Sequence, residues 1–195
     1  MDTNDWITQE ASQLNVPQVR IMLASSCDFL LPNYLFFSQT EKWGNANELA
    51  IYLEFIFNSS QKNNLHIKTP DEFIDGVYKL TPDLDEFGGA ASYAFDAGVA
   101  FYEALLYIKD DDFEHATTAL CMTFDSIDMF QQAALEAGIV SENEVKANLY
   151  EKREIERYKK IFSYIKDKEY FNENDFDYIK QINTTTPYLP IGLLF

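Results

Sequence analysis

The chain has 195 residues with 32 acidic and 15 basic side chains, which gives a formal net charge of −17. Its 47% apolar content is too high for a disordered chain, and its two cysteines exclude a disulfide scaffold. The sequence has no apolar run of about 18 residues, which argues against a membrane span. The net charge argues against nucleic-acid binding, because a phosphate backbone is bound by Lys and Arg.

The N-terminus, Met1-Asp2-Thr3-Asn4-Asp5, has neither the basic nor the apolar segment of a signal peptide. We therefore expect a cytoplasmic protein with reduced thiols.

Helix is the dominant signal along the chain, because apolar residues recur at three- and four-residue spacings and glycine is scarce. This predicts an all-α fold, a single-domain bundle of about eight helices. In chain order we expect helices at residues 4–14, 17–31, 33–42, 46–62, 71–80, 90–108, 113–137 and 142–165, with a further short helix at 174–182 and an extended tail over 184–195.

Capping and breaking residues support these boundaries. Pro17 suits a first helical turn, whereas Pro32 is expected to stop or kink the same helix. The segments Thr69-Pro70-Asp71-Glu72 and Ser141-x-x-Glu144 both match a capping box. The alanine-rich stretch 90–108 predicts a slim helix at the centre of the bundle, since its neighbours can approach closely.

Charged residues alternate in sign along the predicted C-terminal helix. Such a pattern is typical of a surface helix with many ion pairs. The residues concerned are Glu151, Lys152, Arg153, Glu154, Glu156, Arg157, Lys159 and Lys160.

Short motifs in the first two thirds of the chain resemble a known family. They are Ala24-Ser25-Ser26-Cys27, Leu30-Leu31-Pro32-Asn33-Tyr34 with Phe37, Trp43-Gly44, and Pro82-Asp83 followed by Tyr93-Ala94-Phe95-Asp96-Ala97. Together they are similar to the YjaG-like bacterial domain of unknown function over residues 14–140. The resemblance implies an all-helical fold. It implies no particular activity, because the family has no established one. Residues 141–195 depart from the pattern and are expected to be an elaboration with a charged helix, a short helix and the tail.

Acidic residues concentrate in one part of the chain, because residues 71–128 hold 14 acids and two bases. Such a block attracts a cationic partner, and aromatic side chains among the acids are typical anchors of a protein interface. We therefore expect a non-enzymatic protein that binds a basic partner, as an immunity protein neutralises a nuclease-type toxin. The candidate contact residues are Asp83, Asp85, Glu86, Phe87, Tyr107, Asp110, Asp111, Asp112, Phe113 and Glu114.

Two alternatives stay open. Asp96 and Glu103 share one helix face and Asp125 and Asp128 the next, so facing carboxylates with raised pKa values could serve a metal-dependent enzyme. However, no His-Glu-x-x-His or Glu-x-x-His pattern occurs, and we expect no metal and no cofactor. Alternatively, a housekeeping homo-oligomer would dock its apolar tail on a neighbour through Leu189, Ile191, Leu193, Leu194 and Phe195.

Overall fold

The computed structural model describes residues 3–185 and 189–195, and these residues form helices and loops without a β-strand. The predicted all-α fold is confirmed. The helices are α1 (Thr3–Ala11), α2 (Val16–Glu41), α3 (Ala46–Asn58), α4 (Asp71–Leu80), α5 (Ala90–Asp110), α6 (Phe113–Glu136), α7 (Glu142–Ala147), α8 (Leu149–Ile165) and α9 (Glu173–Thr185), followed by a 3-10 turn at Ile191–Leu193.

Helix α2 is the longest element and forms the centre of the core. It begins with a capping box, in which Asn15 and Gln18 each bond the other's backbone, and it packs against α3, α5, α6 and α9. The prediction that one helix ends at residue 31 and another begins at 33 is wrong, because α2 continues through Pro32 to Glu41. A proline inside a helix costs about 3 kcal/mol, and burial along most of α2 outweighs that cost.

The same helix is long and apolar enough to cross a membrane by composition alone, and 67% of its most apolar window is buried inside the fold. A buried core helix passes this test as well as a spanning one does, so the finding is weak evidence for a membrane.

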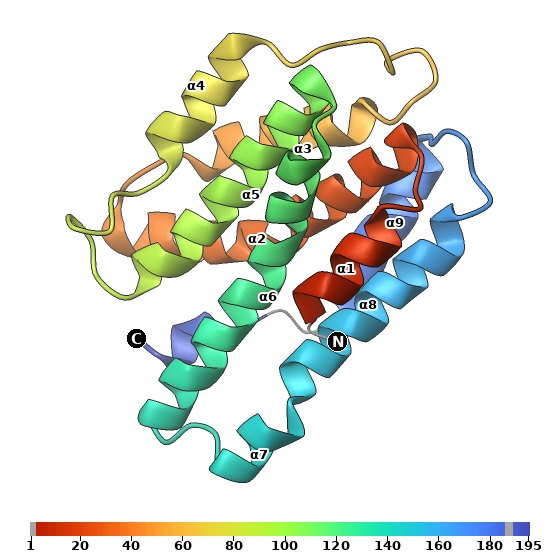
Figure 1. Cartoon of the computed structure of the whole chain (residues 1–195). Helices are drawn as coiled ribbons and strands as arrows, with labels where there is room; N and C mark the ends of the chain where they lie inside the picture. The colour runs from red at the N-terminus through yellow and green to blue at the C-terminus, as the bar shows by residue number, and fades with distance from the viewer. Residues whose placement is uncertain (1–2, 186–188) are drawn as a thin grey trace.

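Helix α5 is slim and lies between other helices, as predicted (Figure 1). Its buried Ala94 and Ala97 let α2 and α6 approach closely. Gly98 faces the loop after α4, where a Cβ atom would overlap Thr81. Thr69 does not cap α4, because its hydroxyl instead donates to the carbonyl of Leu105 at 2.9 Å.

The charged C-terminal segment forms two helices where one was expected. The predicted capping box is confirmed, since the Ser141 hydroxyl accepts from the Glu144 backbone at 3.3 Å and the Glu144 carboxylate accepts from the Ser141 backbone at 2.8 Å. Asn148 then adopts a left-handed conformation (φ 51°) that ends α7, and α8 begins at the next residue. Asparagine tolerates this conformation better than most residues do.

Part of the expected surface ion-pair network is buried. Arg157 is fully buried and donates to the Glu154 carboxylate at 2.5 and 2.8 Å. It also donates to Ser25 on α2 and Asn183 on α9, both at 2.6 Å. The prediction that Glu154 and Arg157 lie at the surface is therefore wrong, and their network ties α2, α8 and α9 together.

The C-terminal tail packs against its own chain. Leu189 and Ile191 are buried in a small cluster with Tyr93, Ile127 and Phe130. The described part of the tail contains the short 3-10 turn, which the prediction of an extended tail missed, while residues 186–188 lie outside the described part. A tail buried in this way leaves mainly its last residues for contact with a neighbour.

Candidate binding groove

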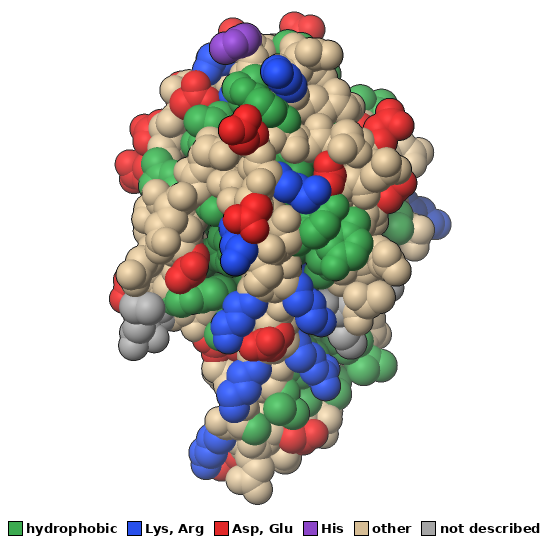
Figure 2. All heavy atoms as spheres, turned by 90° about the vertical axis from the view of Figure 1, so that its right-hand side faces the viewer, with side chains coloured by type: hydrophobic (Ala, Val, Ile, Leu, Met, Phe, Trp, Pro, Cys, Tyr) green, Lys and Arg blue, Asp and Glu red, His purple; other side chains and the backbone are tan. Residues whose placement is uncertain are grey.

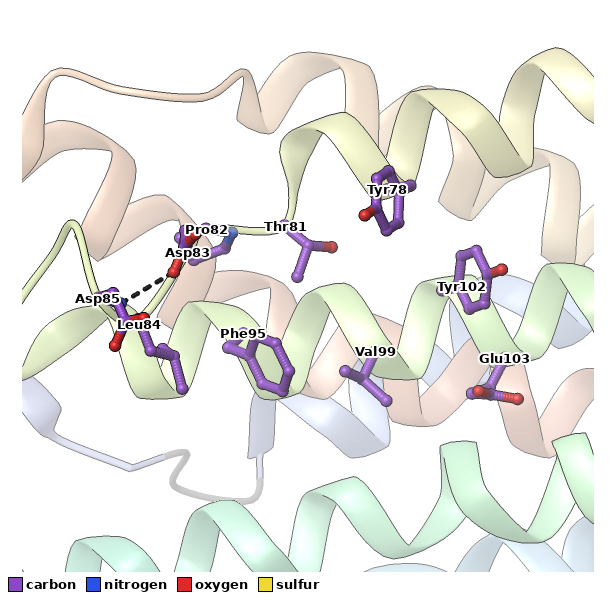
Figure 3. A pocket seen from close by; sticks show the side chains of 10 residues that line it. All are labelled: Tyr78, Thr81, Pro82, Asp83, Leu84, Asp85, Phe95, Val99, Tyr102 and Glu103. Atoms are coloured by element: carbon purple, nitrogen blue, oxygen red, sulfur yellow. Dashed lines mark hydrogen bonds between the residues drawn. The ribbon is translucent and has the colours of Figure 1, made fainter.

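A groove of about 660 Å³ runs along α5 beside α4 and the loop that joins the two helices (Figure 3). Phe95, Val99 and Tyr102 lie on successive turns of α5 and form its floor. Tyr78 of α4 and Leu84 of the loop line it from the opposite side.

Large apolar side chains in this groove are exposed to an unusual extent. Tyr78 is 74% exposed, Leu84 45% and Phe95 37%. Contiguous apolar surface that is left open to water marks an interaction site more often than it marks a folding requirement.

The sequence builds the groove through the two faces of α5. Small residues on one face allow close packing in the core, and Phe95, Val99 and Tyr102 recur at helical spacing on the other. At its far end, the loop is anchored by Phe87, whose ring centroid lies 5.2 Å from that of Trp43. The α4–α5 loop is therefore held at both ends, at Thr81 beside Gly98 of α5 and at Phe87 beside Trp43.

Acidic residues stand at one end of the groove. Asp83 and Asp85 are exposed and line it, and the Asp83 carboxylate accepts from the Asp85 backbone at 2.9 Å. This local turn fixes the loop, while the Asp85 and Glu86 carboxylates stay exposed to solvent.

Glu103 lines the other end of the groove and connects it to the second acidic segment. Its Oε2 lies 2.6 Å from Nδ1 of His115, whose Nε2 lies 3.5 Å from Oδ2 of Asp110. Burial lowers the pKa of His115, but the hydrogen bond to Glu103 and the nearby carboxylates outweigh it and raise this pKa overall. Through His115, the predicted contact residue Asp110 is connected to Glu103 at this end of the groove.

Two predicted contact acids already have partners within the chain. Asp111 lies 3.1 Å from the buried Arg20 and 2.6 Å from Lys68. Burial alone would raise the pKa of Asp111, but these two cations outweigh it and lower this pKa. Asp112 caps α6 and accepts from the backbone of Glu114 at 3.0 Å. Both side chains therefore support the fold.

The predicted aromatic anchors are the part of the site that the structure corrects. Tyr107 is only 3% exposed, so it cannot contact a partner, and burial raises its pKa to about 12. Phe87 and Phe113 are half-buried and pack against the core. All three aromatic residues face the core, and the sequence alone does not distinguish such positions from exposed ones.

The four carboxylates of the enzyme alternative do not share one pocket, because Asp125 and Asp128 line a pocket that includes neither Asp96 nor Glu103, although the charge of Asp125 acts on Asp96. Asp96 accepts from Ser126 at 2.7 Å, and burial raises its pKa to about 6. Burial also raises the pKa of Asp125, whereas Glu103 pairs with His115. Within residues 3–185 and 189–195, no three His, Cys, Asp or Glu side chains are placed to hold a metal ion.

The comparison with known proteins settles the family. A family model described as a protein of unknown function (DUF416) matches residues 7–193. The chain belongs to the DUF416 family. A crystal structure of a DUF416 family protein from Shewanella baltica OS155 has a TM-score of 0.73 and 21% identity, covering 92% of this chain and 93% of that one. No curated protein matches the chain.

These matches extend what the sequence motifs indicated. The motifs covered residues 14–140, whereas the DUF416 match includes nearly all of the segment from 141 onward. That segment is therefore part of the DUF416 fold, in agreement with its place in the buried network around Arg157.

In this DUF416 chain, the groove residues that sequence reasoning missed are Leu84, Phe95 and Val99. A signal was present, because Phe95, Val99 and Tyr102 form a second apolar stripe on a helix whose alanine stripe already serves the core. Tyr78 and Tyr102 stand out in the sequence as aromatic residues among acids.

Proposed function

We propose that this DUF416 chain is a non-enzymatic acidic binding protein of the immunity type, which neutralises a nuclease-type toxin by covering its cationic active site. The observation that carries the proposal is the open apolar groove along α5, with Asp83 and Asp85 at one end and Glu103 at the other. It lies within the part of the chain, residues 71–128, that holds 14 acids and two bases.

The chemistry of the two surfaces is complementary. A nuclease must hold phosphates, so its active site gathers Lys and Arg side chains. An acidic surface attracts such a site over long range and speeds association, while apolar contacts desolvated in the complex slow dissociation. Tyr78, Leu84 and Phe95 supply that apolar contact.

The alternatives receive less support. A carboxylate enzyme would need its acids in one cavity, and Asp96 and Glu103 bond different partners on α6. A homo-oligomer joined by its tail would need Leu189 and Ile191 at its interface, but both side chains are already buried in their own chain. The finer resemblance, to YjaG-like domains within the family, remains a proposal and brings no activity with it.

The first test is the genetic neighbourhood. The proposal predicts a reading frame beside this gene that encodes a basic nuclease-type domain, whose expression alone stops growth of a bacterial host. Co-expression of this chain is expected to restore growth. Absence of such a frame, or failure to restore growth despite soluble expression of both proteins, would contradict the proposal.

The second test separates the groove from the total charge. Asp85→Lys/Glu86→Lys reverses two exposed charges at the groove. Asp167→Lys/Glu169→Lys makes the same change at exposed positions after α8. We expect only the groove variant to lose protection of the host, with unchanged circular dichroism for both. Equal protection by the two variants would exclude the groove as the contact surface.

A further inference from the structure

Basic side chains gather on the exposed face of α8, on the opposite side of the molecule from α4 (Figures 1 and 2). The other face of α8, which carries Arg157, Tyr158 and Ile161, is buried, so the basic face must point outward. The exposed basic residues are Lys152, Arg153, Lys159, Lys160 and Lys166.

Several of these cations have no acidic partner. Lys159 pairs with Glu156 at 2.9 Å, whereas Lys152 donates to the carbonyl of Ala147 at 2.6 Å. Lys160 and Lys166 form no ion pair with any residue in the described part of the chain. On a molecule with a net charge of −17, Lys160 and Lys166 are therefore exposed cations without an ion pair of their own, although Glu156 and Asp167 lie on the same part of the chain.

An aromatic platform lies beside the basic face. A shallow cleft of about 480 Å³ between α8 and α9 is lined by Glu156, Lys159, Lys160, Ser163, Tyr164 and Tyr178. The rings of Tyr164 and Tyr178 have centroids 4.3 Å apart, and Tyr178 is 43% exposed.

The platform is held in place before any ligand arrives. The Tyr164 hydroxyl donates to Asp175 at 2.6 Å, and Lys168 lies over the Tyr164 ring at 4.5 Å and also binds Asp175 at 2.8 Å. A fixed aromatic ring beside lysines, of which Lys160 has no ion pair in the described part of the chain, is an arrangement that suits a base joined to phosphates.

We propose that this face of α8 and α9 binds single-stranded nucleic acid, with phosphates at Lys159, Lys160 and Lys166 and a base stacked on Tyr178. The net charge predicted that the chain does not bind nucleic acid, but that prediction treats the charge as evenly distributed over the surface. The groove lies on α4 and α5, α8 packs against α6 and α9, and charges more than about 8 Å apart are largely screened at physiological salt.

We favour a nucleic acid over another polyanion because the exposed Tyr178 ring offers a surface on which a base can stack. An acidic protein would need the lysines alone and would gain little from a stacking ring. An anionic membrane would need apolar residues to insert, and Leu149 is the exposed large aliphatic residue that α8 provides. A strand with about three phosphate contacts should bind weakly, with a logarithmic salt slope of about −2.

Fluorescence anisotropy of the full chain with a labelled oligo(dT) of about 12 nucleotides at low salt tests this proposal. We expect Lys160→Glu/Lys166→Glu to weaken binding at least about tenfold. Lys42→Glu/Lys79→Glu makes the same charge change at exposed positions directly after α2 and on α4 and should leave the affinity within about twofold. Equal weakening by both pairs, or no binding by the unmodified chain, would overturn the proposal.

A separate experiment tests whether a base stacks on Tyr178. Tyr178→Leu keeps an apolar side chain and removes the stacking surface, and we expect it to weaken oligo(dT) binding about fivefold or more. An abasic oligonucleotide of the same length should bind the unmodified chain more weakly than oligo(dT) and should not respond to Tyr178→Leu. If the abasic strand binds as tightly as oligo(dT), the surface recognises negative charge and not nucleic acid, and the proposal is wrong.

Discussion

Asp96 is a partly buried carboxyl group whose ionised form at neutral pH lowers the stability of the fold. Burial raises its pKa to about 6, although the Ser126 hydroxyl that donates to it acts in the opposite direction. In the unfolded chain the pKa is about 3.9, so the folded chain binds this proton more tightly. The ionised carboxylate therefore destabilises the fold above pH 6, and this cost disappears as the pH falls from about 6 to about 4.

Asp96→Asn should remove that cost. The amide oxygen can still accept from Ser126, so we expect the free energy of unfolding at pH 7.5 to rise by about 1–2 kcal/mol. Urea denaturation measures it, with the exposed Asp128→Asn on α6 as control. The advantage of Asp96→Asn should shrink towards pH 4, and a constant or reversed difference across this range would contradict the assignment.

The pair Glu154 and Arg157 shows where sequence reasoning stops at the residue scale. Opposite charges three residues apart are typical of an exposed helix face, and nothing local tells these two from the exposed Glu156 and Lys159. Only packing against α2 and α9 buries one pair and leaves the other in water. The same limit misplaced Tyr107, whose burial depends on helices distant in sequence.

A double-mutant cycle tests the buried pair. Arg157→Met should destabilise the chain by about 3–5 kcal/mol, because it leaves the Glu154 carboxylate buried without a partner. Glu154→Leu/Arg157→Met should cost less than the sum of the two single changes by at least about 1 kcal/mol. Thermal unfolding of the four proteins measures the coupling. Additive losses would mean that the two charges act independently.

At the scale of elements, the helices with strong local signals were predictable. The helices expected at 71–80, 90–108 and 113–137 agree with α4, α5 and α6 within about two residues, because apolar periodicity and end signals point to the same limits. Prediction failed at Pro32, where burial outweighs a local helix breaker, and at Asn148, where a single left-handed residue divides a charged helix.

The contact of α5 with the α4–α5 loop gives the third prediction. Alanine is a better helix former than glycine by about 1 kcal/mol, so Gly98→Ala would stabilise an isolated α5. In this fold the new Cβ would overlap Thr81, and we expect a net loss of about 1–3 kcal/mol.

The control for that prediction is a compensating change. Gly98→Ala/Thr81→Ala removes the threonine hydroxyl and methyl that the new Cβ would meet, and it should recover about half of the lost stability or more. Chemical denaturation of the two variants decides the matter. A Gly98→Ala chain that is more stable than the original would show that the loop does not lie against α5 as described.

On the scale of the whole molecule, charge is divided between two sides. Asp83, Asp85 and Glu103 of the acidic stretch 71–128 line the groove on α5, and exposed lysines lie on α8. The sequence predicted the acidic side from residue counts, because those residues are contiguous in the chain. It did not predict the basic side, since the charges of 139–195 nearly cancel and only the fold shows which of them share the exposed face of α8.

The central claim is that the carboxylates at the groove act by attraction. Stopped-flow measurement of association with the nuclease-type domain encoded beside the gene tests it most directly. The rate constant for the unmodified chain and for Asp167→Lys/Glu169→Lys should fall at least about tenfold between about 25 mM and about 250 mM salt. For Asp85→Lys/Glu86→Lys the association rate constant should be lower at low salt and should depend less on the salt concentration. Identical rates and salt dependence for the two variants would contradict the account.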